Sequence, residues 1–281
     1  MRFGFKTSPQ HTTWSAMLDV WRAADDIDLF ESGWNFDHFY PIHSDDSHGP
    51  CLEGWSTLTA LAQATTRVRV GVLVTGMPYR HPAVLANMAA TVDIISNGRL
   101  ELGIGAGWNL EEADAYGIDL GDTLTERFDR FDEGVQVLLT LLENRVSNFH
   151  GEYYDLTDAY CEPKPVQRPH PPLCIGGAGH RRTIPAAARW ADHWNHPGGS
   201  PETWAADHEV FLAACERIGR DPAEITTSIH LLADAADPAR TVAQAAAFAE
   251  VGVQLGIVYL PPPHAPAVLE AHADALRQLV D

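Results

Sequence analysis

The first 110 residues repeat one pattern four times, and this repetition constrains the fold more than any other feature of the sequence. A short apolar run is followed each time by a stretch whose apolar residues recur at helical spacing. The expected strands cover residues 2–6, 34–40, 67–74 and a run from 98. The expected helices cover 52–64, 82–96 and a segment that begins near 14 and is stopped by Ser32 and Gly33. Because the links are short, the pattern predicts parallel βα units.

The same alternation resumes in the second half of the chain. Further strands are expected at 173–175, 193–195, 225–231 and 253–259, and further helices at 124–143, 183–191, 201–218, 238–251 and 266–280. Between the fourth and fifth strands, an extended segment at 145–159 and five prolines within 163–172 predict an insertion, because proline does not fit a helix interior. Eight strands and eight helices predict an α/β fold, a (β/α)8 TIM barrel, as one domain over residues 1–281.

Charge and cysteine content limit the partners and the compartment. The formal net charge of −19 disfavours nucleic acid and anionic membranes as partners. The four cysteines have neither metal-site nor redox-motif spacing, which favours reduced thiols. The N-terminus lacks an apolar signal core, and no run approaches the roughly 18 apolar residues of a membrane span. We therefore expect a cytoplasmic protein without a membrane or nucleic-acid partner.

The C-terminal ends of the expected strands hold most of the unusual residues. In (β/α)8 barrels the ligand lies at these ends. They comprise 6–8, Asp37 and His38, Thr75 and Gly76, 103–108, 176–179, Asn195 and His196, and 261–263. The strand order predicts that these segments converge on one site.

A glycine loop follows the fifth strand. Gly176, Gly177, Ala178 and Gly179 precede a helix that starts near residue 183. Free backbone N–H groups and the helix dipole at such a point attract a phosphate, and Arg181 and Arg182 would add charge. The alternative is a plain tight turn between strand and helix.

His38 is the candidate acid or base, because a histidine at a strand end can give or take a proton near neutral pH. Its neighbour Asp37 fits an orienting or a core-edge carboxylate. The nearby segment 43–48 contains metal-ligand residue types, but loop clusters of this kind are mostly solvated, and we expect no metal.

A second glycine loop, GIGAG at 103–107, is followed by Trp108 and two glutamates. A dinucleotide fingerprint requires GxGxxG after a first strand, whereas this GxGxG follows the fourth, which disfavours a Rossmann fold. Trp108 either stacks on a flat cofactor ring or covers the barrel rim. The position also places Glu111 or Glu112 near a ligand, and Glu111 is our candidate contact.

Three stretches closely resemble the luciferase-like flavin and deazaflavin oxidoreductases, within them the F420-dependent branch. They are GRLELGIGAGWNLEEADAYG from Gly98, EYYDLTDAYCEPKPVQRPHPPLCIGGAG from Glu152, and RWADHWN from Arg189. The resemblance extends over nearly the whole chain. It implies a (β/α)8 barrel, a homodimer, and hydride transfer between coenzyme F420 and a small organic substrate.

The resemblance also implies roles for particular residues. The cofactor ring would lie against a bulge after the third strand, at Val72, Leu73 and Thr75, where the family often has a non-prolyl cis peptide. The phosphate-bearing chain would contact Ala106, Gly107 and the loop from Gly176 to Gly179. Asp37 and His38 match an Asp-His pair of the branch, which makes His38 the expected catalytic residue and Asp37 an expected cofactor contact.

Two positions depart from the branch members that oxidise alcohols and sugar phosphates. Those members have a tryptophan four residues after the histidine and a glutamate directly after the fourth-strand glycines, where this chain has Ile42 and Trp108. These departures disfavour oxidation of alcohols or sugar phosphates, and we expect reduction of an activated double bond, an imine or another acceptor by reduced F420 as an equal alternative. Two alternatives stay open: an FMN-dependent monooxygenase of the same family, and a non-catalytic cofactor-binding barrel.

Overall fold

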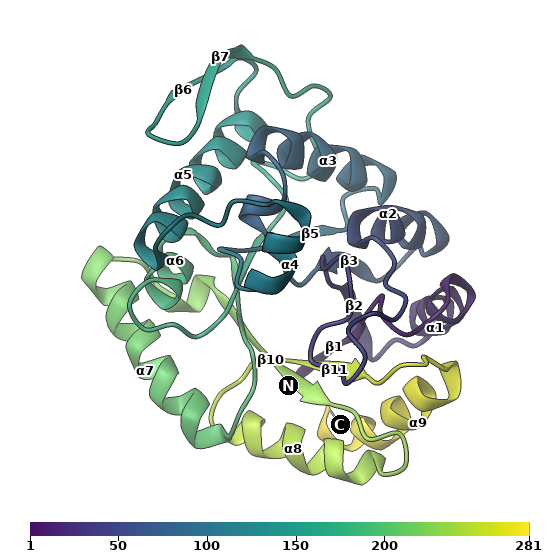
Figure 1. Ribbon diagram of the computed structural model, residues 1–281. Helices are drawn as coiled ribbons and strands as arrows, with labels where there is room; N and C mark the ends of the chain where they lie inside the picture. Colours follow the sequence, from purple (N-terminus) through teal and green to yellow (C-terminus); the bar gives the residue numbers. More distant parts are fainter. Residues whose placement is uncertain (281) are drawn as a thin grey trace.

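The computed structural model describes residues 1–280, and its strands close into a parallel barrel (Figure 1). The barrel strands are β1 (Arg2–Thr7), β2 (Phe30–Asn35), β3 (Arg69–Val72) with β4 (Thr75–Gly76), β5 (Leu100–Gly105), β8 (Leu173–Gly176), β9 (His193–His196), β10 (Thr226–Leu232) and β11 (Leu255–Leu260). β3 and β4 are two segments of the third strand, and pairing of β3 with β5 and of β1 with β11 closes the sheet. The predicted (β/α)8 barrel is confirmed.

Helices surround the barrel. They are α1 (Trp14–Asp26), α2 (Gly54–Ala64), α3 (Pro82–Ile95), α4 (Leu110–Tyr116), α5 (Leu124–Glu143), α6 (Thr183–Trp190), α7 (Pro201–Ile218), α8 (Pro238–Glu250) and α9 (Pro266–Leu276). Short 3-10 turns cover Met77–Tyr79, Pro222–Glu224 and Arg277–Leu279. Side-chain caps fix several starts: Thr13, Thr123 and Ser200 accept backbone hydrogen bonds from α1, α5 and α7. None of the helices within residues 1–280 is long and apolar enough to span a membrane.

The second strand begins earlier than predicted, at Phe30 instead of residue 34. Ser32 and Gly33 were expected to end the first helix, but α1 already ends at Asp26. Gly33 is a site of close packing inside the sheet, because a Cβ there would lie 2.6 Å from the Phe5 ring. As a result, Asp37 and His38 lie beyond the strand, in the loop at its C-terminal end.

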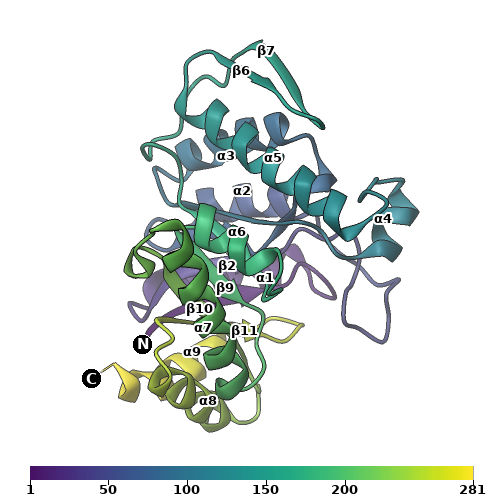
Figure 2. The ribbon, with the colours of Figure 1, turned by 90° about the vertical axis from the view of Figure 1, so that its left-hand side faces the viewer.

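The segment between β5 and β8 contains α4, α5 and an antiparallel hairpin of β6 (Ser147–His150) and β7 (Asp155–Ala159). Figure 2 shows the hairpin far from the strands and α4 beyond their C-terminal ends, on the side opposite both termini. The Glu133 carboxylate of α5 accepts the backbone N–H groups of Glu152 and Tyr153, which fastens the hairpin to that helix.

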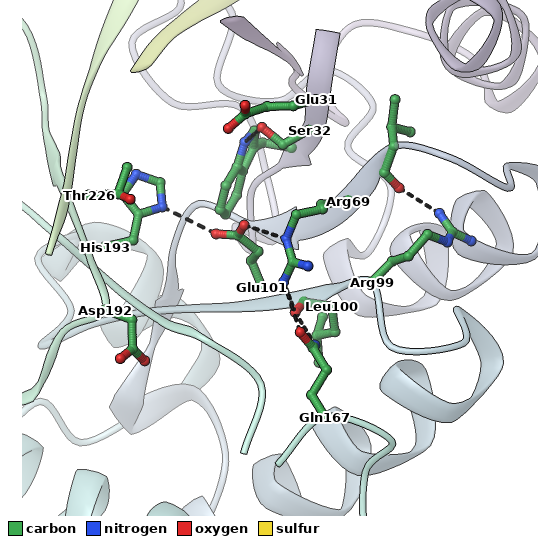
Figure 3. Close-up of polar contacts among 12 residues, drawn as sticks. Glu31, Ser32, Arg69, Arg99, Leu100, Glu101, Gln167, Asp192, His193 and Thr226 are labelled. Atoms are coloured by element: carbon green, nitrogen blue, oxygen red, sulfur yellow. Dashed lines mark hydrogen bonds and ion pairs between the residues drawn. The ribbon is translucent and has the colours of Figure 1, made fainter. Parts of the chain in front are cut away.

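The barrel interior has an apolar layer and a polar layer. Trp34, Leu73, Cys174, Leu255 and Ile257 form the apolar layer. Nearer the N-terminal strand ends, the Glu101 carboxylate lies 2.6 Å from Nε of Arg69 and 3.2 Å from Nδ1 of His193 (Figure 3). Buried charges are tolerated when they are paired in this way.

Candidate active site

A cavity of about 1020 Å³ opens at the C-terminal ends of the barrel strands. The strand ends converge there as the sequence predicts. The lining includes Lys6, His38, Gly76, Ala106, Gly107, Trp108, Gly176, Gly177, Gly179, Asn195 and Pro261. The barrel mouth is therefore the candidate ligand site.

His38 is held by a carboxylate from α4. Its Nδ1 lies 2.7 Å from Oε2 of Glu112, and only 8% of the His38 side chain is exposed. The Tyr79 hydroxyl donates to the same oxygen at 2.6 Å, and the backbone N–H of Phe39 donates to Oε1. Because an ionised carboxylate only accepts hydrogen bonds, Nδ1 carries a hydrogen, and Nε2 is the nitrogen left for a ligand.

The protonation of this cluster follows from its contacts. Burial acts to raise the pKa of Glu112, but hydrogen bonds from His38, Tyr79 and Phe39 outweigh it, so that the pKa is lowered. Burial and the hydrogen bond to Glu112 raise the pKa of Tyr79. Near neutral pH, Glu112 is therefore an anion and Tyr79 a neutral donor.

The structure brings Glu112, rather than the expected Glu111, to His38. Successive residues of a helix point about 100° apart. Glu112 faces inward and is buried, whereas Glu111 is exposed and does not line the cavity. Glu111 therefore has no place in the cavity lining, and Glu112 takes part in the site through His38 and not as a lining residue.

Trp108 forms part of the cavity wall beside His38. The two rings meet edge to face with centroids 5.5 Å apart, and Trp108 stacks on His43 at 5.3 Å with an interplanar angle of 3°. About half of Trp108, 52%, is exposed.

Within residues 1–280 no group of three or more His, Cys, Asp or Glu side chains is arranged to hold a metal ion.

Asp37 points away from the cavity. Its fully buried carboxylate accepts two hydrogen bonds from Arg80, one of them 3.1 Å long. Arg80 also lies 3.5 Å from Glu53, the residue that caps α2. This geometry makes Asp37 a core-edge carboxylate that anchors the start of the loop through Arg80, and Asp37 does not line the cavity.

The third strand is interrupted by a cis peptide bond between Leu73 and Val74, at the position where the family resemblance implies a bulge. Leu73 and Val74 line the cavity, whereas Val72 and Thr75 do not. The Thr75 hydroxyl accepts a hydrogen bond of 2.8 Å from Trp55 and so faces α2. The cavity wall at this strand consists of Leu73, Val74 and Gly76.

The glycine loop after β8 meets the cavity through Gly176, Gly177 and Gly179, while Ala178 does not line it. Gly177 has a φ of +119°, which a residue with a side chain rarely adopts. Arg182, expected to add charge here, is instead paired with Asp129 at 2.6 Å and Asp132 at 3.2 Å on α5. Arg127 also lines the cavity, and its guanidinium donates to the carbonyl of Gly107, in the other glycine loop, at 3.4 Å.

A sequence model of the luciferase-like monooxygenase family matches residues 1–279. The chain belongs to this family. Its (β/α)8 fold also agrees with that of an F420-dependent secondary alcohol dehydrogenase solved with an F420–acetone adduct. The two structures align with a TM-score of 0.88 over 100% of this chain and 99% of that one, at 20% identity. At this identity the likeness concerns the fold alone.

Two relatives in sequence have different activities. An F420-dependent glucose-6-phosphate dehydrogenase from Amycolatopsis mediterranei is 32% identical over 178 residues, which cover 63% of this chain and 52% of the relative. The pyrimidine monooxygenase RutA of Methylobacterium radiotolerans is 33% identical over 173 residues, 60% of this chain and 44% of the relative. The chain thus spans about half the length of the curated relatives it matches.

Sequence reasoning missed several residues that line the cavity of this luciferase-like protein, and it left Glu112, which holds His38, as an alternative to Glu111. Tyr79 and Arg127 lie within helical segments, where nothing local marks them as facing the site. Glu112 was one of two adjacent glutamates, and His230 lies inside a run interpreted as a strand. No local signal separates Glu112 from Glu111, because both lie in the first turn of α4.

Proposed function

We propose that this protein is an F420-dependent oxidoreductase that transfers a hydride between the cofactor and a small organic substrate in the barrel cavity. The observation that carries the proposal is the hydrogen bond between His38 and the buried Glu112, beside a cavity walled by glycines. The relationship to an F420-dependent dehydrogenase at 32% identity supports the choice of cofactor.

The cavity wall fits a flat ring with a phosphate-bearing chain. A Cβ at Gly105 would lie 2.9 Å from the Val74 side chain, and a Cβ at Gly176 would lie 3.0 Å from it, so these glycines keep the wall beside Val74 open. Gly107 and Gly177, both at positive φ, present backbone to the same space. The Arg127 guanidinium and the dipole of α6 would provide the charge for a phosphate. The first turn of α6 offers few free donors, because the Ile184 N–H is bonded to the Gly179 carbonyl and Pro185 has no N–H.

The residues of this chain would then act as follows. Leu73 and Val74 would support the ring, and the glycine loops with Arg127 would hold the phosphate. When bound, F420 supplies hydride acceptance or donation at C5 of its deazaflavin ring. His38 would exchange the accompanying proton through Nε2, while Glu112 holds Nδ1 and stabilises the imidazolium.

The substrate is better sought among acceptors than among alcohols or sugar phosphates. Ile42 and Trp108 both line the cavity, at the two positions where this chain departs from the branch members that oxidise those compounds. Trp108 brings an apolar ring next to His38, where those members carry a carboxylate. We therefore propose reduction of an activated double bond or imine by reduced F420.

Cofactor titration tests the proposal. Purified cofactor-free protein is titrated with F420 and with FMN, and binding is followed by the chromophore absorbance. We expect micromolar binding of F420. Micromolar FMN binding without an F420 response would instead establish the monooxygenase alternative, which the pyrimidine monooxygenase relative favours.

Four further expectations are part of the proposal. The chain is one domain over residues 1–281, although Asp281 lies outside the described residues. The segment between β5 and β8 that carries the β6–β7 hairpin is an insertion relative to a minimal barrel. The protein is a homodimer, which light scattering after size exclusion tests, and it resides in the cytoplasm.

A further inference from the structure

The charge of the cavity is opposite to that of the protein. The sequence has 38 acidic and 19 basic residues, yet the described residues that line the cavity include neither Asp nor Glu. Lys6 and Arg127 both line it. Low-dielectric walls with one sign of charge concentrate ligands of the other sign. The cavity therefore favours an anion at two separate sites. Arg127 and the glycine loops form the first of them.

Lys6 is the second place, deep in the barrel. It lies on β1, and only 5% of the residue is exposed. Its Nζ donates to the Leu73 carbonyl at 3.0 Å and lies 4.8 Å from the centre of the Tyr259 ring. No carboxylate of residues 1–280 forms an ion pair with it. An ammonium has three hydrogens to donate, so Lys6 retains donors that the protein does not use.

His230 lies on β10 and lines the same part of the cavity. Its ring contacts Tyr259 at a centroid distance of 5.7 Å, so that Lys6 and His230 flank this tyrosine. Nε2 of His230 is buried and finds no hydrogen-bond partner among the described residues. Burial and the charge of Lys6 lower the pKa of His230, which keeps the imidazole neutral.

A buried lysine without an ion-pair partner, beside an imidazole whose Nε2 has no hydrogen-bond partner, destabilises a fold, and such pairs are retained where a ligand completes them. Burial also lowers the pKa of Lys6 to about 7, with Cys174 acting in the opposite direction. The titratable groups that face Lys6 are Cys174, His230 and Tyr259. An anion bound to Lys6 would hold it in the charged form.

We infer that Lys6 and His230 form a binding subsite for a carboxylate, and that the substrate is a small organic acid with an apolar body. The body would rest on the apolar lining, which includes Phe36, Val74 and Ile175. A carboxylate subsite would define the substrate class of the proposed oxidoreductase. It rests on the proposed function only for the claim that the bound acid is the compound that reacts. Binding of the acid requires no cofactor.

The test compares 3-phenylpropanoate with 3-phenylpropanamide by calorimetry on cofactor-free protein at pH 6.5. We expect the carboxylate to bind at least tenfold more tightly than the amide. Lys6→Met should abolish this preference and raise Tm, because it removes an unpaired buried charge. Lys164→Met is the matched control: the Lys164 ammonium donates to the carbonyls of Leu141, Asn144 and Cys161, outside the cavity. It should keep the preference.

Equal binding of acid and amide, or a preference that survives Lys6→Met, would overturn the inference. If Lys6→Met does not fold, the pH dependence of the native protein decides, because the preference should decline between pH 6 and 9 as Lys6 loses its proton. A constant preference contradicts the inference.

A third ligand, 5-deazariboflavin, distinguishes a cofactor site from a substrate site. If Lys6→Met weakens the binding of 5-deazariboflavin alone, the subsite binds the cofactor ring and the inference is wrong. Failure of F420 to bind would refute the proposed function and leave the carboxylate result standing.

Discussion

Nδ1 of His38 lies 2.7 Å from Oε2 of Glu112, a carboxylate with no exposed side-chain surface. Glu112→Gln preserves the size of the side chain and removes the charge that stabilises a protonated imidazole. We expect kcat to fall by about tenfold or more while KM changes less, because His38 keeps its place at the cavity. His38→Ala should cost about 100-fold in kcat. Steady-state kinetics with F420 and an accepted substrate measure both.

The neighbouring glutamate provides the control for this change. Glu111→Gln alters the same net charge one residue away, on the exposed face of α4. It should leave kcat and KM within about twofold of the native values, as surface changes do. Equal losses from Glu111→Gln and Glu112→Gln would mean that net charge, and not the contact with His38, governs the rate.

Arg127 and Arg182 make a second matched pair. Arg127 lines the cavity near Gly107, whereas Arg182 is paired with Asp129 and Asp132. Arg127→Met should raise the Kd of F420 about tenfold and reduce its salt dependence, because a phosphate loses a charged donor. Arg182→Met should leave Kd unchanged. An increase in Kd with Arg182→Met alone would restore the sequence-based assignment of this arginine to the phosphate site.

The sequence predicted the barrel because strand and helix periodicities are local signals that eight successive units repeat. It placed His38, Trp108 and the glycine loops correctly at the barrel mouth because strand order alone determines which ends meet. The start of β2 was predicted too late, because Ser32 and Gly33 resemble the end of a helix in the sequence. The sequence does not show that the rings of Phe5 and Trp21 pack on Gly33.

Side-chain direction at loops and helix starts was the part that sequence could not supply. Arg182 follows a glycine loop, so its charge suggested a phosphate contact, but the two aspartates that bind it lie about 50 residues earlier in the chain. Asp37 is adjacent to His38 and yet faces Arg80. Such choices depend on partners distant in sequence, and only the packed structure reveals them.

The polar layer in the barrel interior should give the protein a pH-dependent stability. Burial acts to lower the pKa of His193, but Cys174 and Glu101 raise it to about 10. A basic group with a raised pKa in the folded state contributes its stability fully below its ordinary pKa near 6.5 and loses it as pH rises toward 10. The contribution of His193 should therefore decline between these two values.

Urea unfolding of the native protein and of His193→Gln, measured in steps from pH 6 to 10, isolates this effect. Titrating groups that are not coupled to His193, including Lys6, are common to both proteins and cancel in the difference. The difference in the free energy of unfolding should be largest near pH 6 and shrink toward pH 10. A difference that stays constant over this range would show that His193 is neutral in the fold, bound to Ser228 at 2.6 Å as an uncharged partner.

The pair of Asp37 and Arg80 should be a stability element instead of a cofactor contact. The Asp37 side chain is fully buried and that of Arg80 is 15% exposed, and breaking such a pair leaves one charge buried without its partner. We expect Asp37→Ala to lower the free energy of unfolding by about 3 kcal/mol. Arg80→Met combined with Asp37→Ala should recover part of this loss, because the uncompensated guanidinium is gone.

Since Asp37 does not line the cavity, the Kd of F420 should change less than twofold in Asp37→Ala at temperatures where this variant is folded. A tenfold weaker F420 affinity with an unchanged free energy of unfolding would return Asp37 to the ligand site that its position beside His38 first suggested.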